Sequence, residues 1–305
     1  MKIAYELPDK VLSNGDLVRT YAEWTEEKIF AKTGIVSRRI ANVNESALDL
    51  AERAARRLFA EYGVCADEID FLLLCTQSPE YRLPSSACLL QDRLGIPTTA
   101  GALAFDHGCS GFIYGLSLAK GLVAGGMAKN VLLVTAETYT KYIADDDKST
   151  RSIFGDGAAA TLVDELAASK IGAFSFGTDG SGAEKLIVRN GRLFMDGPDI
   201  FNFTLDVVPK TMDDVLAKNG MTRDDIDLYV FHQANKFMLD TIREVNGLPG
   251  GKFYLNLEMT GNTVSSTIPI ALKQLENGGR LRSGAKVMLM GFGVGLSWGS
   301  TIIST

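Results

Sequence analysis

The pattern of apolar and polar positions divides the chain into alternating helices and strands. A helical pattern covers residues 47–63, and DEIDFLLLCTQS at 67–78 then leads from an acidic turn into an apolar run typical of a buried strand. The same succession recurs later, with a helical pattern at 207–220 and DDIDLYVFHQAN at 224–235. This alternation predicts right-handed βαβ units and sheets that are rich in parallel strands.

Two pairs of matching apolar runs are separated by the same interval. Asp70 and Asp227, which precede the first pair, are 157 residues apart. Lys129 and Lys286, which precede the runs VLLVTAE and VMLMGFG, are also 157 residues apart. A constant interval across two separate strand pairs indicates that one half of the chain duplicates the other.

The duplication divides the chain into an N-terminal half at 1–165 and a C-terminal half at 166–305. Each half carries an apolar helical segment between its two matched strands, at 112–126 and at 261–279, and each segment ends in a pair of glycines. The first of these segments shows almost no polar face, so we expect it to be buried on all sides. Two such halves should pack into layers.

Composition and charge exclude several classes of protein. The chain has 305 residues with 46% hydrophobic content and a formal net charge of −6, which disfavours a nucleic-acid partner. The N-terminus has no apolar signal region and no apolar run is long enough for a membrane span, so we expect a cytoplasmic protein. Four scattered cysteines and two histidines predict neither a disulfide framework nor a metal site.

The candidate nucleophile is Cys109, in FDHGCSGFIYGL at 105–116. It lies at the start of the first apolar helix, where unpaired backbone amides favour an anion and should lower the pKa of the thiol. The alternative is a small buried residue that fills a gap. We favour that alternative for the other three cysteines, which lie in helical or strand patterns: Cys65, Cys75 and Cys88.

Two polar side chains stand at positions that should face the thiol. His232 directly follows the apolar strand DLYVF, and groups just beyond the carboxyl end of a strand line the crevice of an α/β sheet. Asn262 lies in the loop before the second apolar helix. A thiol with an imidazole indicates nucleophilic acyl chemistry, and an amide beside them could donate to an oxyanion. His107 is a rival imidazole, for which we favour a structural role.

Two glycine-containing motifs need separate interpretations. GFGVGLSWG at 291–299 follows a strand and leads into another strand, with no helix to receive a pyrophosphate, so a dinucleotide site is disfavoured. We expect a turn that presents backbone amides near the site. FGDGAAATLV at 154–163 is typical of a turn that enters a strand, and its Asp156 should be structural.

Taken in order along the chain, these motifs resemble the β-ketoacyl-acyl carrier protein synthase III family. The resemblance rests on KTGIVSRRI at 32–40, GCSGFIYGL at 108–116, FGDGA at 154–158, HQAN at 232–235 and GNT at 261–263, together with GFGVGLSWG. It implies an α/β fold of the thiolase type, five-layered α-β-α-β-α from two duplicated halves, in a homodimer.

The resemblance also implies a reaction. Cys109 would take an acyl group from acyl-CoA, and malonyl-acyl carrier protein would then lose carbon dioxide and attack the acyl-enzyme in a decarboxylative Claisen condensation. His232 and Asn262 would hydrogen-bond the thioester carbonyl, and the backbone amides of Cys109 and Val294 would form the oxyanion hole. No metal or redox cofactor is implied.

Several positions depart from the family pattern. Lys28 stands where the family often has a tryptophan that stacks on the CoA adenine, while Trp24 lies four residues earlier. Phe237 replaces a basic residue implicated in carrier-protein docking, and GFGVG replaces GFGGG. A basic patch for phosphopantetheine or an acidic carrier protein could still come from Lys28, Arg38, Arg39, Lys148, Arg151 and Lys236, each of which could equally be a solvated surface charge.

Some alternatives stay open from the sequence. The segment 192–205 should form a cap over the acyl channel or a dimer contact, or its apolar residues belong to the core. Cys109 and His232 could instead pass the acyl group to an oxygen, nitrogen or sulfur acceptor without decarboxylation, although Asn262 argues against this. A non-catalytic partner subunit is a third reading. The acyl chain length, the donor and the pathway are not determined.

Overall fold

Two mixed β-sheets form the centre of the protein. The computed structural model describes all residues from Met1 to Thr305. The first sheet has the strand order β1-β7-β6-β4-β5, with bounds Lys2–Glu6, Gly157–Val163, Val131–Glu137, Phe71–Cys75 and Gly101–Phe105. The second sheet has the order β11-β12-β13-β8, with bounds Leu228–Phe231, Lys286–Gly293, Ser297–Ser304 and Ile171–Thr178.

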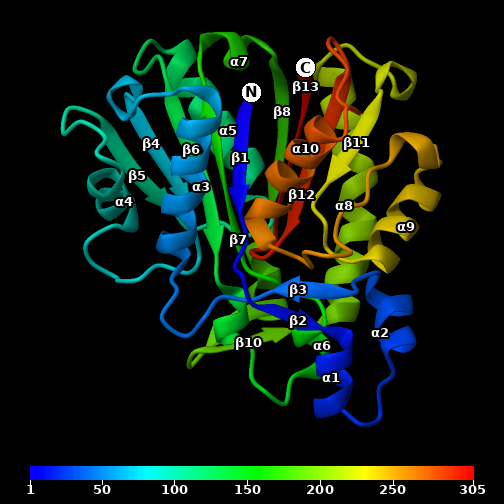
Figure 1. Ribbon diagram of the computed structural model, residues 1–305. Coiled ribbons are helices and arrows are strands. Elements are labelled where there is room, and N and C mark those ends of the chain that lie inside the picture. The colour runs from blue at the N-terminus through cyan, green and yellow to red at the C-terminus, as the bar shows by residue number, and fades with distance from the viewer.

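Helices separate and cover the two sheets, so that the molecule has five layers (Figure 1). α5 (Gly111–Ala124) and α10 (Thr267–Asn277) each contact strands of both sheets and form the middle layer. The outer face of the first sheet is covered by α3 (Ala47–Tyr62) and α4 (Ser86–Leu94). The outer face of the second sheet is covered by α8 (Gly197–Lys218), against which α9 (Lys236–Val245) packs.

The sheets are parallel at the strands that the repeat matched and at β5. β4 pairs in parallel with β5 and β6, and β11 pairs in parallel with β12. The remaining pairs of the two sheets are antiparallel, so the prediction of parallel-rich sheets holds for only part of each sheet. In the second sheet the reason is visible in the chain, since the three residues 294–296 turn β12 straight back into β13.

Local sequence signals explain where the outer helices begin and end. α3 starts at a capping box, in which Ser46 accepts from the Asp49 amide and Asp49 accepts from the Ser46 amide, and it stops at Gly63 with φ +62°. α8 begins well before the predicted start at residue 207, because Asp196 caps it and proline stands in its first turn. The predicted segment 192–205 thus forms β10 (Arg192–Met195) and the first turns of α8.

A smaller group of elements lies at the end of the molecule opposite both termini (Figure 1). It consists of α1 (Asn14–Thr20), α2 (Glu26–Thr33), α6 (Lys148–Arg151), the β2–β3 pair (Val11–Ser13 and Ser37–Arg39) and the β9–β10 hairpin, whose first strand is Leu186–Arg189. The division between the two sheets falls at α7 (Glu165–Ser169), between β7 and β8.

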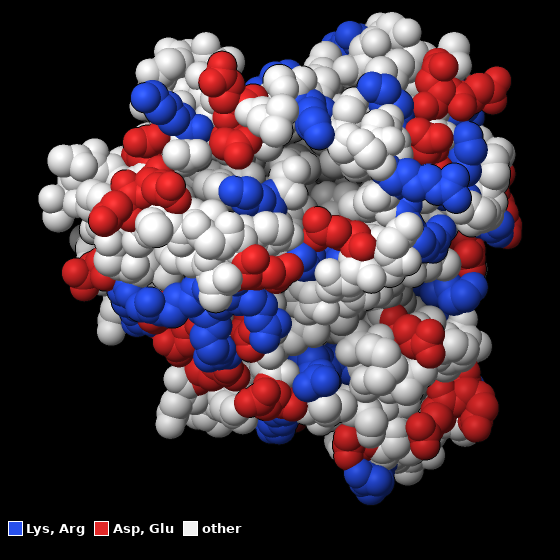
Figure 2. All heavy atoms as spheres, turned by 45° about the horizontal axis from the view of Figure 1, so that its top comes forward, with Lys and Arg blue, Asp and Glu red and all other residues white.

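The surface carries charges of both signs. Figure 2 shows acidic and basic side chains intermixed over the visible face, with no extended region of a single sign. Ion pairs join many of these groups, as between Arg57 and Glu6 at 3.2 Å and between Arg93 and Asp49 at 2.9 Å.

None of the helices has both the length and the apolar character that a membrane span requires.

Candidate active site

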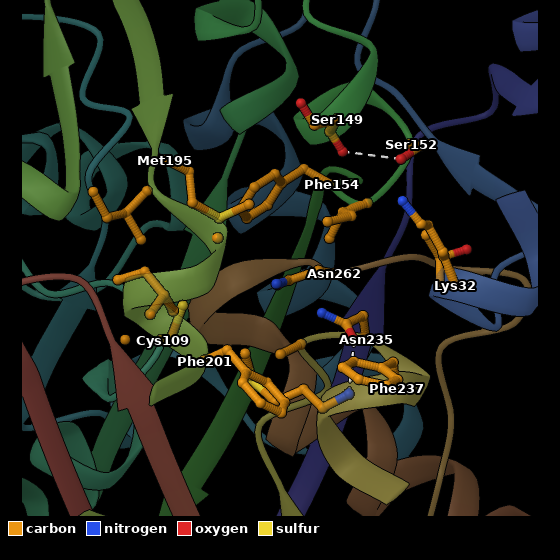
Figure 3. Close-up of a pocket in the computed structure, with 18 of the residues that line it drawn as sticks. Lys32, Cys109, Ser149, Ser152, Phe154, Met195, Phe201, Asn235, Phe237 and Asn262 are labelled. Atoms are coloured by element: carbon orange, nitrogen blue, oxygen red, sulfur yellow. Dashed lines mark hydrogen bonds between the residues drawn. The ribbon is translucent and has the colours of Figure 1, made fainter. Parts of the chain in front are cut away.

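The structure brings the thiol, the imidazole and the carboxamide to one cavity. Cys109 precedes α5, His232 follows β11, and Asn262 lies in the loop before α10, yet all three line a cavity of about 620 Å³. Each of the three is at least nine-tenths buried. Figure 3 shows Cys109 and Asn262 within this cavity, below Met195 and Phe154. The three loops that the sequence pointed to therefore converge.

Close backbone packing holds Cys109 in place. A Cβ atom at Gly293 would lie 2.9 Å from the Sγ of Cys109, and one at Gly291 would lie 2.6 Å from its carbonyl oxygen. Any larger residue at either position would displace the nucleophile, because real Cβ atoms do not approach other atoms that closely. Gly291 and Gly293 of GFGVG therefore allow the hairpin β12–β13 to reach the thiol.

The ionisation of the thiol differs from the sequence-based expectation. Burial raises the pKa of Cys109 to about 12, and Glu137, once it is ionised, acts in the same direction. Hydrogen bonds from the backbone amides of Val294 and Cys109 lower the pKa but do not overcome these effects. The prediction of a lowered pKa at the helix start was wrong, because the thiol is enclosed by protein rather than exposed at an open helix end. In the resting enzyme Cys109 is a thiol.

His232 is neutral, and its orientation is fixed by Thr267. Burial lowers the pKa of the imidazole to about 3. Nδ1 lies 2.8 Å from the hydroxyl oxygen of Thr267, which in turn donates to the carbonyl of Val264 at 3.1 Å. Since that hydroxyl has only one proton, it accepts from Nδ1–H, and the proton of the neutral ring is on Nδ1. Nε2 then presents a lone pair on the side of the ring that Asn262 faces.

Asn262 is held with its amide nitrogen toward the imidazole. Its Oδ1 accepts from the backbone amide of Val264 at 2.8 Å, and its Nδ2 lies 3.4 Å from Nε2 of His232. Val264 is fully buried and has φ +54°, which is unusual for a β-branched residue. This strained residue anchors both polar side chains. Its amide donates to Asn262, and its carbonyl accepts from the Thr267 hydroxyl that positions His232.

The walls of the cavity are mostly apolar. Phe154, Met195, Ile200, Phe201, Phe237 and Phe292 line it. Met195 and the first turns of α8 belong to the segment 192–205, for which a cap and a core were both left open, and they border the cavity directly. Trp24 and Lys32 also line the cavity, so Trp24 reaches the site although it lies outside the family position.

Arg38 is not a surface cation. It is fully buried, and its guanidinium donates to the carbonyl oxygens of Leu12 and Ser152 and to Oδ1 of Asn14, at 2.9–3.2 Å. Its assignment to a CoA or carrier-protein patch was wrong, because these bonds tie β3 to α1 and to the loop after α6. Burial also lowers its pKa to about 10.

The other basic candidates do not line the cavity. Three of them are paired with carboxylates, Lys148 with Glu23 at 2.5 Å, Arg151 with Asp145 at 2.7 Å and Lys236 with Asp240. Lys28 is exposed on α2, and Arg39 donates to backbone oxygens of Pro8 and Asp9. Lys32 is the basic side chain among the lining residues.

Comparison with known proteins identifies the family. Residues 105–180 match the profile described as 3-oxoacyl-[acyl-carrier-protein (ACP)] synthase III, and residues 216–305 match the profile of its C-terminal region. The beta-ketoacyl-[acyl-carrier-protein] synthase III 2 of Halalkalibacterium halodurans is 36% identical over 97% of this chain and 93% of its own. The chain belongs to the 3-oxoacyl-[acyl-carrier-protein] synthase III family.

Further relatives of this family agree in sequence and in fold. The synthase III of Staphylococcus saprophyticus is 35% identical over 97% of this chain and 95% of its own. A crystal structure of a 3-oxoacyl-(acyl-carrier-protein) synthase III matches with a TM-score of 0.96 and 49% identity over 99% of this chain and 98% of that one. The synthase III of Thermus thermophilus matches with a TM-score of 0.93 and 34% identity over 99% and 98%. The predicted thiolase fold and the predicted function of a condensing enzyme like synthase III are confirmed.

The remaining sequence candidates lie outside the cavity. His107 packs against Tyr114 with ring centroids 4.3 Å apart and is not a lining residue. Cys75 is buried and donates to the carbonyl of His107, as expected for a filler, whereas Cys65 and Cys88 are exposed and contradict that expectation. The acidic turn before β4 and the outward face of α4 leave these two thiols at the surface.

One buried carboxyl group near the site was missed by the sequence. Glu137 ends β6 and is fully buried, and burial raises its pKa to about 8. It accepts from the Gln77 amide at 3.0 Å, from the Ser78 hydroxyl at 2.8 Å and from the Ser265 hydroxyl at 3.4 Å. The signal available in the sequence was a charged residue that closes an otherwise apolar run, directly beyond the buried strand VLLVTA.

Proposed function

We propose that Cys109 accepts the acyl group of an acyl-CoA thioester and that the acyl-enzyme then condenses with malonyl-acyl carrier protein with loss of carbon dioxide. The observation that supports this proposal is the shared cavity. A thiol, an imidazole whose Nε2 carries a lone pair and a carboxamide nitrogen 3.4 Å from that Nε2 line the same apolar space of about 620 Å³. In this enzyme of the synthase III family, these are the groups that acyl transfer and decarboxylation require.

In the acyl-transfer step, the thiol of Cys109 attacks the thioester carbonyl. Because burial raises the pKa of the thiol to about 12, its proton must leave as the attack proceeds, and Nε2 of His232 accepts it. The carbonyl oxygen becomes an oxyanion that accepts from the backbone amides of Cys109 and Val294. The new C–S bond forms, the CoA thiolate leaves, and the proton passes from Nε2 to that thiolate.

In the condensation step, the malonyl thioester takes the place of CoA in the cavity. Its carboxylate leaves as carbon dioxide, and the electrons of the broken C–C bond form an enolate on the thioester oxygen. Nδ2 of Asn262 donates to that oxygen, whereas the neutral ring of His232, whose proton is on Nδ1, has no donor at Nε2 for the enolate. The enolate carbon then attacks the acyl carbonyl carbon, the bond from that carbon to Sγ of Cys109 breaks, and the released thiolate takes a proton from solvent water. The apolar walls favour this step, since the localised charge of the carboxylate is replaced by a charge that is delocalised over the enolate.

The same proposal extends to partners and cofactors. The pantetheine arm of either substrate would enter past Trp24 and Lys32, which line the cavity at α2. The steps use protein groups alone, so we propose no metal or redox cofactor.

A second copy of the chain would cover the free edge of β5, which pairs only with β4 and exposes 46% of Leu103. The homodimer is thus part of the proposal.

The test is intact-mass analysis of the full-length protein with a panel of acyl-CoA donors. We expect one acyl mass on the wild type and none on Cys109→Ala. Addition of malonyl-acyl carrier protein should then release carbon dioxide and return the enzyme to its unmodified mass. Failure of every acyl-CoA and acyl-carrier donor to form an adduct would refute the proposal.

The alternative is transfer of the acyl group to an oxygen, nitrogen or sulfur acceptor. The orientation of Asn262 argues against this alternative, because its Oδ1 is held by the Val264 amide and its Nδ2 faces the cavity as a donor. A donor stabilises an enolate oxygen. It cannot accept the proton that an oxygen, nitrogen or sulfur nucleophile must lose. In Asn262→Ala we expect acylation within about tenfold of the wild type and carbon dioxide release reduced about a hundredfold or more. Equal losses in both steps would contradict this assignment.

A further inference from the structure

A second cavity lies beside the hairpin that carries the proposed oxyanion hole. It has a volume of about 310 Å³, and its mostly apolar lining includes Tyr139, Leu186, Leu193 and Val294. Leu186 lines both this cavity and the larger one, and Val294 follows Gly293, which lines the larger one. The two cavities are therefore neighbours on either side of the turn that contacts Cys109.

Two side chains meet at the residue directly before the nucleophile. A Cβ atom at Gly108 would lie 2.3 Å from Cγ1 of Val294 and 2.7 Å from Oε1 of Gln77. Both of these side chains also line the second cavity. Val294 and Gln77 thus border the second cavity beside Gly108, the residue directly before Cys109.

Gln77 is held rigidly in this position. Its backbone amide donates to both carboxyl oxygens of the buried Glu137, at 3.0 and 3.2 Å. Its backbone carbonyl accepts from the hydroxyl of Tyr142 at 3.2 Å, and its Oε1 accepts from the hydroxyl of Tyr139. The backbone of Gln77 is thus fixed at its amide and its carbonyl, and the side chain cannot turn aside for a ligand without breaking its bond with Tyr139.

Val294 is fixed by the hairpin. It lies between Gly293 and Gly295, so neither of its chain neighbours has a side chain. Its carbonyl accepts from the hydroxyl of Ser297 at 2.8 Å, and its amide faces the thiol of Cys109. The isopropyl group is therefore held against Gly108, in a place that a glycine would leave open.

We propose that Val294 and Gln77 determine acyl-chain specificity by narrowing the passage from Cys109 to the second cavity. The proposal rests on the proposed function, in which the larger cavity holds the pantetheine arm and the acyl group on Cys109 must extend elsewhere. A short, unbranched acyl group fits beside the two side chains. A longer chain must pass between them into the second cavity, and their fixed positions oppose it.

The experiment measures single-turnover acylation by intact mass with acetyl-, butyryl-, hexanoyl- and octanoyl-CoA. For the wild type, we expect the octanoyl rate to be at least about tenfold below the acetyl rate. Val294→Gly and Gln77→Ser should each raise the octanoyl-to-acetyl ratio about tenfold or more, because each widens the passage by a different side chain. Two variants at separate elements protect the test against a folding failure of either one.

Val188→Ala is the matched control. Val188 lines the second cavity but lies on β9, is 42% exposed and does not contact Gly108. We expect its octanoyl-to-acetyl ratio to stay within about twofold of the wild type. The specificity inference would be overturned if the wild type transferred octanoyl groups as fast as acetyl groups, or if the octanoyl-to-acetyl ratio were unchanged in both passage variants. Neither result would affect the proposed function. Absence of any acyl adduct would instead overturn the proposed function.

Discussion

The amide nitrogen of Asn262 lies 3.4 Å from Nε2 of His232, and both residues are anchored through Val264. The Val264 amide holds Oδ1 of Asn262 at 2.8 Å, and the Val264 carbonyl holds the Thr267 hydroxyl that accepts from His232. The two polar groups are therefore oriented before any substrate arrives. Such preorganisation avoids the cost of aligning dipoles during the reaction.

The first prediction concerns Thr267, which positions His232 without lining the cavity. In Thr267→Val the hydroxyl is replaced by a methyl group, so Nδ1–H loses its acceptor and Nε2 no longer presents a fixed lone pair. We expect kcat for condensation to fall about tenfold to a hundredfold. Steady-state kinetics with malonyl-acyl carrier protein measures this.

The control for that substitution is Thr267→Ser. Serine keeps the hydroxyl and should retain activity within about threefold of the wild type. If Thr267→Val and Thr267→Ser lose activity equally, the hydroxyl has no role and the effect belongs to packing at the start of α10.

The second prediction concerns the ionisation of Cys109. Because burial raises the pKa of this thiol to about 12, its alkylation by iodoacetamide should accelerate about tenfold per pH unit from pH 7 to pH 10, without a plateau. Peptide mass spectrometry must follow Cys109 itself, since Cys65 and Cys88 are exposed and also react. A plateau that begins below pH 8 would show that the thiol is already ionised and that the burial argument is wrong.

The third prediction concerns the pH dependence of stability through Glu137. Burial raises its pKa to about 8 from an ordinary 4.5, so between these values the unfolded state loses this proton while the folded state keeps it. The free energy of unfolding should therefore fall with rising pH across this interval, by about 1.4 kcal/mol per pH unit from this one group.

Glu137→Gln removes that titration and keeps the shape of the side chain. The difference in unfolding free energy between the variant and the wild type should grow in favour of the variant from pH 5 to pH 8. Urea unfolding at several pH values measures it. A difference that stays constant over this range would mean that Glu137 titrates normally in the fold.

The fourth prediction separates a structural arginine from a ligand contact. Arg38→Met would leave the carbonyl oxygens of Leu12 and Ser152 without their buried donor, so the free energy of unfolding should drop by about 2–4 kcal/mol. Lys28→Ala, at an exposed position, should change it by less than about 0.5 kcal/mol. A raised KM for acyl-CoA in Arg38→Met with unchanged stability would restore the original assignment.

The elements that could be predicted are those whose signal is local. The helix at 47–63 and the apolar strands that follow Asp70 and Asp227 were confirmed, because burial periodicity and caps are written in neighbouring residues. The early start of α8 was not predicted, since its first turns are as apolar as a core segment and face the cavity. The antiparallel strands were missed because pairing direction depends on contacts between distant parts of the chain.

By itself, the sequence determined the apolar pattern that recurs after 157 residues, the glycine motif at 291–295 and the three loops that carry Cys109, His232 and Asn262. Only the tertiary structure decided the burial, the charge state and the orientation of the side chains. The thiol is un-ionised because distant segments enclose it, Arg38 is buried because α1 and the loop after α6 surround it, and Gln77 matters because Glu137 and two tyrosines hold it. Charge state and fixed orientation depend on the dielectric and the partners around a group, and these come from residues far away in the chain.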